Sequence, residues 1–129
     1  PACARPSTSG NDGVESHAVT TLLVLTNLPD RPAAEDLARE LVEARLAACV
    51  NILPACHSIY RWQGVLETAD EVPLLIKTTS ERYPALQAAI RNRHPYELPE
   101  VIALPVIQGL PDYLAWVARE TRPPRLTSP

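Results

Sequence analysis

The side chains of this sequence that best suit a soft or borderline metal ion lie far apart along the chain. In its central part they are Cys49, Cys56, His57 and His94. Thiolate and imidazole ligands favour copper and zinc. No CxxC or HxxxH spacing is present, and adjacent strand residues such as Cys56 and His57 point to opposite faces. A metal site would therefore draw on separate elements or separate subunits, and we predict weak copper binding by Cys49, His94 and a carboxylate such as Glu97.

The same residues also have structural interpretations. Cysteine is one of the most buried residue types, so Cys49 is also a candidate small apolar residue of the core. His94 precedes Pro95, and because the residue before proline avoids the helical region, His94 is a candidate cap at a helix end. An unperturbed histidine pKa of about 6.5 also suits a ligand, a base or a pH sensor. Glu97 and Glu100 offer hard oxygen ligands, or else belong to a solvated loop.

Aromatic and cationic side chains form a second candidate set. They are Tyr60, Trp62, Lys77, Tyr96 and Trp116, and Lys77 is the only lysine of the chain. Clefts between subunits are common ligand sites, so we predict a cleft of this kind lined by Tyr60 and Trp62. Within it, Lys77 and His94 would bind a small anionic ligand. The alternative is that Trp62 and Trp116 anchor a core or a subunit interface.

Motifs of the common enzyme classes are absent. The sequence contains no nucleophile elbow, P-loop, dinucleotide-binding fingerprint or zincin motif. Acid–base catalysis by His94 with Glu97 or Tyr96 is the least favoured function, because no second clear acid–base partner is present. We therefore expect a binding protein and not an enzyme.

Composition favours a single soluble domain. The chain has 129 residues and a hydrophobic fraction of 46%, which is enough for one compact core. A formal net charge of −3 argues against nucleic acid or an anionic membrane as a partner, and no apolar run approaches the roughly 20 residues that span a bilayer. The three cysteines do not have the spacing of a disulfide framework, and the first residues do not show the basic and then apolar pattern of a secretory signal. Both features favour a cytoplasmic location. Residues 1–17 are expected to form a disordered tail, 18–122 the folded domain, and 123–129 a second short tail.

Hydrophobic periodicity predicts the elements that must position these residues. Strands are expected at 19–26, 49–62, 72–79 and 101–107, and helices at 31–46, 80–93 and from 111 onward. Asp30 and Ser80 are the expected helix N-caps. Pro54 must create an edge, a bulge or a break in the second strand, and Gln63-Gly64 can turn the chain into a hairpin.

The predicted order of elements is β-α-β-β-α-β-α. This is the split βαβ, or ferredoxin-like, arrangement of the α+β class with an added C-terminal helix. Two helices cover one face of an antiparallel sheet. The other face also carries apolar residues, and no element is left to cover it. We therefore predict that sheets of neighbouring protomers pack there, with the long hairpin reaching across.

Five segments carry a family pattern: LAACVNI at 46–52, SIYRWQG at 58–64, EVPLLIKT at 71–78, HPYELPE at 94–100 and DYLAW at 112–116. In order and spacing they resemble the CutA family, the divalent-cation tolerance proteins, over about residues 20–120. The resemblance implies a ferredoxin-like protomer in a PII-like homotrimer whose strands join between subunits. Thr26-Asn27, Arg61 and Cys56-His57 depart from the family pattern, and the last pair is where a new metal site could arise.

The resemblance also implies an association with tolerance of copper and other divalent metals. On this basis we expect a trimeric protein that binds divalent metal ions, copper in particular, and acts in the response to metal. The alternative is a PII-like sensor of a small ligand, or a scaffold for protein partners, without catalytic activity.

Overall fold

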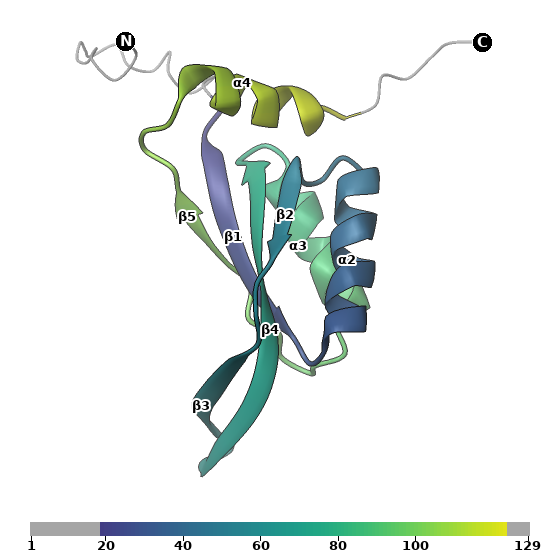
Figure 1. Ribbon diagram of the computed structural model, residues 1–129, viewed down its shortest axis with the longest axis vertical. Helices are drawn as coiled ribbons and strands as arrows, with labels where there is room; N and C mark the ends of the chain where they lie inside the picture. The colour runs from purple at the N-terminus through teal and green to yellow at the C-terminus, as the bar shows by residue number, and fades with distance from the viewer. Residues whose placement is uncertain (1–18, 124–129) are drawn as a thin grey trace.

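The computed structural model describes residues 19–123; the expected tails at 1–17 and 123–129 lie outside this range, apart from Pro123. Within it, the element order is β-α-β-β-β-α-β-α (Figure 1). The strands are β1 (Thr21–Leu28), β2 (Cys49–Ile52), β3 (Cys56–Trp62), β4 (Val65–Thr79) and β5 (Ile102–Pro105). The helices are α2 (Arg31–Glu43), α3 (Tyr83–Arg93) and α4 (Pro111–Glu120). No helix within 19–123 is long and apolar enough to cross a membrane.

The strands are antiparallel, and β4 connects the two parts of the sheet. β2, β4, β1 and β5 lie side by side in that order, whereas β3 pairs with β4 alone. In the main sheet, Ile76 of β4 lies opposite both Val24 of β1 and Val50 of β2. The N-terminal half of β4 pairs with β3 in a hairpin that projects from the body of the protein (Figure 1). This arrangement confirms the α+β, ferredoxin-like fold with an added C-terminal helix.

Pro54 divides the long strand that the sequence predicts into β2 and β3. The N–H of Leu53 still donates to the carbonyl of Pro73 (3.0 Å), but Pro54 has no N–H with which to continue the ladder. The hairpin then turns at Gln63 and Gly64, whose φ angles are 51° and 82°. Two residues with positive φ are what a tight hairpin turn requires. Of the edge, bulge or break that was expected at Pro54, the structure shows a break between β2 and β3.

The core lies between the sheet and the helices α2 and α3. Alternate residues of β1 and β4 point into it, among them Val24, Leu74 and Ile76, all fully buried. Leu41 of α2 and Ile90 of α3 belong to the same cluster. The period of two in the strands and of 3.6 in the helices brings these residues into one layer.

One predicted helix cap is confirmed and one is wrong. Oδ1 of Asp30 accepts a hydrogen bond from the N–H of Ala33 (2.9 Å) and caps α2 as expected. α2 ends before the predicted boundary, because Arg45 adopts a left-handed φ of 60°. α3 has no side-chain cap. Oγ of Ser80, the predicted cap, instead accepts a hydrogen bond from the N–H of Thr20 (3.2 Å) and fastens the start of β1.

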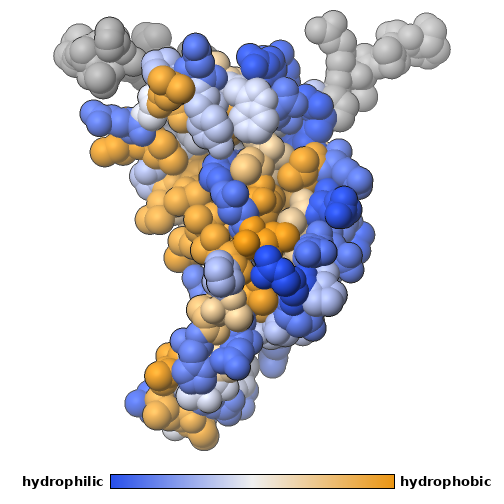
Figure 2. Space-filling view, viewed as in Figure 1, coloured by the Kyte–Doolittle hydropathy of each residue, from blue (hydrophilic) through white to orange (hydrophobic). Residues whose placement is uncertain are grey.

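The sheet face opposite α2 and α3 is left uncovered within one chain. α4 crosses one end of the sheet only (Figure 1). We call the remainder the open face and define it by Leu23, Leu25, Leu75, Ile102 and Leu104. Leu104 and Ile102 are each 49% exposed, and Figure 2 shows apolar side chains gathered over β5 and the adjoining strands. The expectation of an uncovered apolar sheet face is thus confirmed for the single chain.

Candidate functional site

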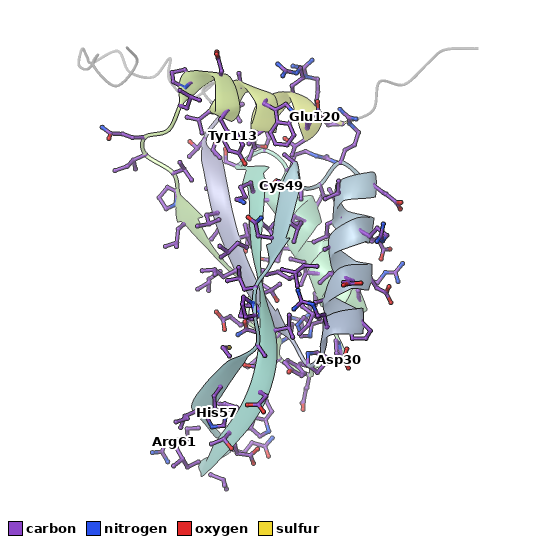
Figure 3. The ribbon with its side chains drawn as sticks, in the orientation of Figure 1. Asp30, Cys49, His57, Arg61, Tyr113 and Glu120 are labelled. Carbon is purple, nitrogen blue, oxygen red and sulfur yellow. The ribbon has the colours of Figure 1, made fainter. Side chains whose placement is uncertain are left out.

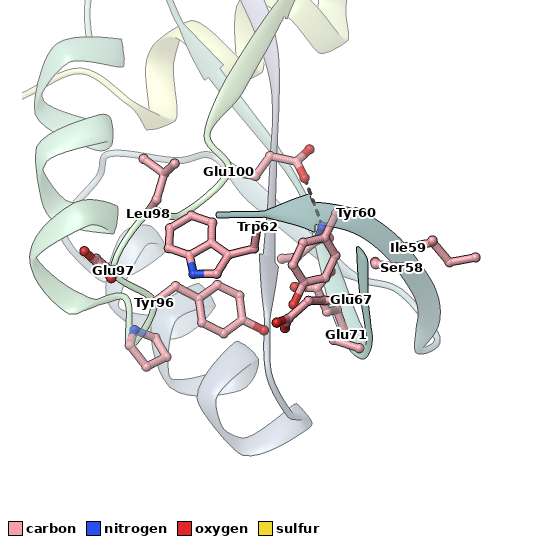
Figure 4. Close-up of a pocket in the computed structure, with 13 residues that line it drawn as sticks. Ser58, Ile59, Tyr60, Trp62, Glu67, Glu71, Tyr96, Glu97, Leu98 and Glu100 are labelled. Carbon is pink, nitrogen blue, oxygen red and sulfur yellow. Dashed lines mark hydrogen bonds between the residues drawn. The ribbon is translucent and has the colours of Figure 1, made fainter. Parts of the chain in front are cut away.

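A cleft of about 840 Å³ opens where the hairpin meets the loop that follows α3 (Figure 4). Because strand residues alternate in direction, Ser58, Tyr60 and Trp62 of β3 face it together. Glu67 and Glu71 face it from β4, with Glu67 directly opposite Tyr60 in the strand pair. The hairpin therefore presents aromatic rings and carboxylates on one surface.

The opposite wall of the cleft is the loop at 95–100, which carries Tyr96, Glu97 and Glu100. Pro95 and Pro99 restrict its backbone and keep it out of the helix. Oε1 of Glu100 accepts a hydrogen bond from Nδ2 of Asn27 (3.1 Å), which ties the loop to the end of β1. We call this space the aromatic-acidic cleft. Its defining residues are Tyr60, Trp62, Glu67, Glu71, Tyr96, Glu97 and Glu100.

The charge of the cleft is negative. Four glutamates line it, and among the described residues no lysine, arginine or histidine does. Glu71 is only 9% exposed and forms no ion pair within 19–123. Burial, followed by the hydrogen-bonding effect and the charge of Glu71, raises the pKa of Tyr96 to about 12. The cleft is therefore suited to cations and not to anions.

His94 lies behind the wall of the cleft and not in it. Its Nε2 donates to the carbonyl of Asn27 (2.6 Å), and its Nδ1 accepts from the N–H of Tyr96 (3.2 Å). This pair of partners fixes the neutral Nε2–H tautomer. Burial lowers the pKa of His94, against the opposing effects of Asn27 and Glu71. His94 can bind a metal only if one of these hydrogen bonds opens, so metal ligation by His94 remains a prediction.

The lowered pKa of His94 leads to a pH dependence of stability. In unfolded chains, His94 takes up a proton as the pH falls below its unperturbed pKa of about 6.5. In folded chains, His94 takes up this proton only at a lower pH, because its pKa is lowered. The free energy of unfolding is therefore expected to fall between pH 7.5 and 5.5 when measured by urea unfolding. A His94→Gln variant should lose part of this slope, whereas His57→Gln, at an exposed position, should keep it. Equal slopes for wild type and His94→Gln would contradict the assignment.

Cys49 and Lys77 lie together on the sheet, away from the cleft. The two residues are paired across β2 and β4, with Nζ of Lys77 3.6 Å from Sγ of Cys49 and hydrogen-bonded to Oδ1 of Asn51. Tyr113 of α4 lies beside Cys49 (Figure 3), and burial, with a smaller effect of Cys49, raises the pKa of Tyr113. These four residues share the end of the sheet that α4 crosses.

The structure assembles only part of each predicted site. Tyr60 and Trp62 line a cleft within one chain, whereas the prediction placed them in a cleft between subunits. Lys77 stands six residues beyond Glu71 along β4, about 20 Å away. The predicted site for an anion is therefore not formed by one chain.

The predicted metal ligands are also separated. Cys49 and Leu23 both pair with Lys77 of β4, so Cys49 lies level with Leu23 of β1. His94 contacts Asn27, which is four residues, or about 13 Å, further along β1. In the described part of the chain, no three His, Cys, Asp or Glu side chains surround one point. A site of Cys49, His94 and Glu97 would thus need residues from different subunits.

Cys56 and His57 point to opposite faces of the hairpin, as alternation predicts. Sγ of Cys56 lies 3.7 Å from Oγ of Ser58, which lines the cleft. Nδ1 of His57 lies 2.8 Å from Oδ1 of Asp70, which is opposite His57 in the strand pair. Both partners of that pair are exposed. The two adjacent residues therefore do not act on one ion.

Sequence reasoning missed Glu67 and Glu71 as site residues. Pairing the strands about the predicted turn at Gln63-Gly64 places Trp62 opposite Val65 and Tyr60 opposite Glu67. Continued alternation from Glu67 then brings Glu71 to the same face. The register of the hairpin was thus the signal that could have identified both carboxylates.

Comparisons with known proteins agree with this fold. Residues 22–120 match the family model described as CutA1 divalent ion tolerance protein. The chain is 46% identical over 99 residues to the divalent-cation tolerance protein CutA of Thermus thermophilus, covering 77% of this chain and 96% of that protein. It is 45% identical over 118 residues to mouse protein CutA, covering 92% of this chain but 66% of the mouse protein.

Solved structures give the same result. The divalent cation tolerance protein of Thermus thermophilus superposes with a TM-score of 0.78 at 44% identity, covering 79% of this chain and 99% of that one. A protein described as the periplasmic divalent cation tolerance protein CutA of Archaeoglobus fulgidus has a TM-score of 0.77 at 31% identity, covering 79% and 99%. The matched range extends from β1 to the end of α4 and includes the cleft. The chain therefore belongs to the CutA1 divalent ion tolerance protein family.

Proposed function

We propose that this protein binds divalent metal ions, copper in particular, and serves in the response to metal as a homotrimer without catalytic activity. The observation that carries the proposal is the charge of the aromatic-acidic cleft, which four glutamates line without a basic side chain from the described residues. Such a surface concentrates cations. Family membership supports the same function, because relatives of this chain are named divalent-cation tolerance proteins.

The metal ligands in this proposal come from more than one subunit. Glu97 is exposed on the loop wall and offers a hard carboxylate oxygen. Cys49 and His94 offer the softer sulfur and nitrogen that copper prefers. Since no three candidate ligands meet within residues 19–123, a neighbouring subunit supplies the rest of the coordination shell. This requirement links metal binding to assembly.

The trimer is supported by apolar surface that one chain leaves exposed. The open face is half exposed at Ile102 and Leu104, and the hairpin carries Ile59 and Leu66 at 65% and 66% exposure. Exposed apolar side chains in this number mark an interaction site. Three copies that share their open faces and hairpins would bury them.

Calorimetric titration of the full chain with Cu(II) tests the metal function. We expect stoichiometric binding, and a loss of about tenfold or more in affinity on Glu97→Gln, Cys49→Ser or His94→Ala, each of which removes one ligand. Glu81→Gln is the matched control, because Glu81 is exposed and outside the cleft. Isotherms equal to wild type for all three variants would reject these ligands. Absence of binding for Cu(II), Zn(II) and Ni(II) alike would reject the function.

A PII-like sensor of a small anion, or a protein scaffold, is the alternative. It is favoured by Lys77, a partly buried cation on the open face beside Cys49 and Asn51, where a neighbouring subunit could complete a site. Thermal-shift screening of anionic metabolites against wild type and Lys77→Gln separates the alternatives. A shift that Lys77→Gln abolishes would favour the sensor.

We also propose a cytoplasmic location. Cys49 and Cys56 are both free thiols in the described chain, and free thiols persist in a reducing compartment. Fractionation of cells expressing the native gene tests this proposal, since recovery in a periplasmic or secreted fraction would reject it.

A further inference from the structure

We propose that the aromatic-acidic cleft binds a linear alkyl polyammonium ion, whose separated charges face Glu71 and Glu67 while its methylene chain packs on Tyr60, Trp62 and Tyr96. This ligand class is independent of the metal ion proposed above, and it does not require Cys49 or His94. The cleft volume of about 840 Å³ lies within the ordinary range of small-molecule sites.

Glu71 is the first reason for the proposal. The residue as a whole is only 9% exposed and lines the cleft, yet its carboxylate forms no ion pair in the described chain. Tyr96, whose pKa Glu71 helps to raise, can satisfy only part of the accepting capacity of this carboxylate. A buried carboxylate without a cationic partner is costly, and a bound cation would remove that cost. Among the described residues, the charge of Glu71 acts on the basic group of His94, whose neutral form supplies no positive charge.

The spacing of the carboxylates decides the kind of cation. Glu67 and Glu71 stand four residues apart on one face of β4, about 13 Å along the strand. Two strand positions this far apart do not form a ready-made chelate for one small ion, and no group of three metal-ligating side chains is present in residues 19–123. A small monovalent ion would neutralise only one of the two carboxylates. An extended ion with several ammonium groups can pair with both.

The aromatic rings lie where the hydrocarbon part of such an ion would pass. Figure 4 shows Trp62, Tyr96 and Tyr60 around the cleft, with the Tyr96 hydroxyl directed toward the carboxylates of β4. Tyr60 lies directly opposite Glu67 in the strand pair, and Tyr96 is close enough to Glu71 for the carboxylate to raise its pKa, so each carboxylate has an aromatic neighbour. Aromatic faces attract ammonium groups and also pack against methylene chains.

Trp62 can report binding directly. The chain has two tryptophans, so Trp116→Phe leaves Trp62 as the only one. In this background, titration with spermidine at low ionic strength is expected to change the emission of Trp62 saturably. Glu71→Gln should weaken binding about tenfold or more, the usual loss when a buried charge-assisted contact is removed. Glu67→Gln, at an exposed position, should weaken it about two- to fivefold. Glu43→Gln, on the exposed surface of α2, is the matched control and should bind as the background does.

Each remaining result has a defined meaning. If Mg(II) at matched ionic strength changed the Trp62 emission as much as spermidine does, the change would be charge screening, and the proposal would be wrong. If tetramethylammonium bound as tightly as spermidine, separated charges would be unnecessary, and the proposal would also be wrong. An unchanged affinity in both glutamine variants would overturn it as well. Should Glu71→Gln fail to fold by circular dichroism, Glu67→Gln decides alone, because Glu67 is exposed. Copper titration of the same variants keeps this outcome separate from the metal function.

Discussion

Replacing Leu104 by glutamate is expected to convert the proposed trimer into single subunits. Leu104 lies on the edge strand β5 and is 49% exposed in one chain, so a carboxylate there can reach water in the monomer. In a trimer that buries the open face, the same carboxylate would lose water without gaining a partner. Burying an unpaired charge costs several kcal/mol, and about 1.4 kcal/mol is a tenfold change in association. Dissociation at micromolar concentration should follow.

Sedimentation velocity measures this outcome as a mass. Wild type should sediment near three times the 14.1 kDa of one chain, and Leu104→Glu near 14.1 kDa. Val42→Glu is the matched control, because Val42 is 41% exposed but stands on α2, outside the open face. It should remain a trimer. If Leu104→Glu remained a trimer, the subunit interface would not include the open face. If wild type were a stable monomer, the proposed homotrimer would be wrong.

The body of the fold could be predicted from the sequence because its apolar residues follow clear periods. Residues 19–26 and 72–79 are apolar and rich in β-branched side chains, which identified β1 and the C-terminal half of β4. The N-terminal half of β4 was missed as part of one continuous strand. Residues 65–70 belong to the projecting hairpin, with exposed side chains on both faces at Leu66 and Glu67, so no hydrophobic alternation marks them.

The candidate site was harder to predict, because it depends on distances along a strand. Residue type drew attention to Tyr60 and Trp62, and both line the cleft. The same reasoning added Lys77, which lies about 20 Å from Glu71 on β4. His94 was also chosen for its chemistry, yet two local hydrogen bonds occupy both of its ring nitrogens. Hydrogen-bond partners of this kind arise from packing and leave no trace in spacing.

Replacing Ile76 by alanine is expected to lower the free energy of unfolding by about 2–5 kcal/mol, the range for a fully buried isoleucine. Ile76 is 0% exposed at the centre of the sheet, between Val24 of β1 and Val50 of β2. Both neighbouring strands and the helices above them would lose contacts. Urea unfolding at one fixed protein concentration measures the change, since assembly makes stability depend on concentration.

Ile107→Ala is the matched control for this substitution. Ile107 is 87% exposed in the segment between β5 and α4, so the change should stay within about 0.5 kcal/mol of wild type. A larger loss there would mean that a neighbouring subunit covers Ile107. A loss at Ile76 below about 1 kcal/mol would contradict the packing of the core.

The position of Ile76 also links the core to the cleft. β4 continues without interruption from Ile76 to Glu71 and Glu67, so one strand holds both the centre of the sheet and a wall of the cleft. Packing lost at Ile76 should loosen that wall, because the hairpin pairs only with itself beyond Glu71 and depends on the main sheet for its direction. If Ile76→Ala bound spermidine more weakly although Glu67 and Glu71 are unchanged, the rigid packing of the sheet would contribute to the positions of these carboxylates.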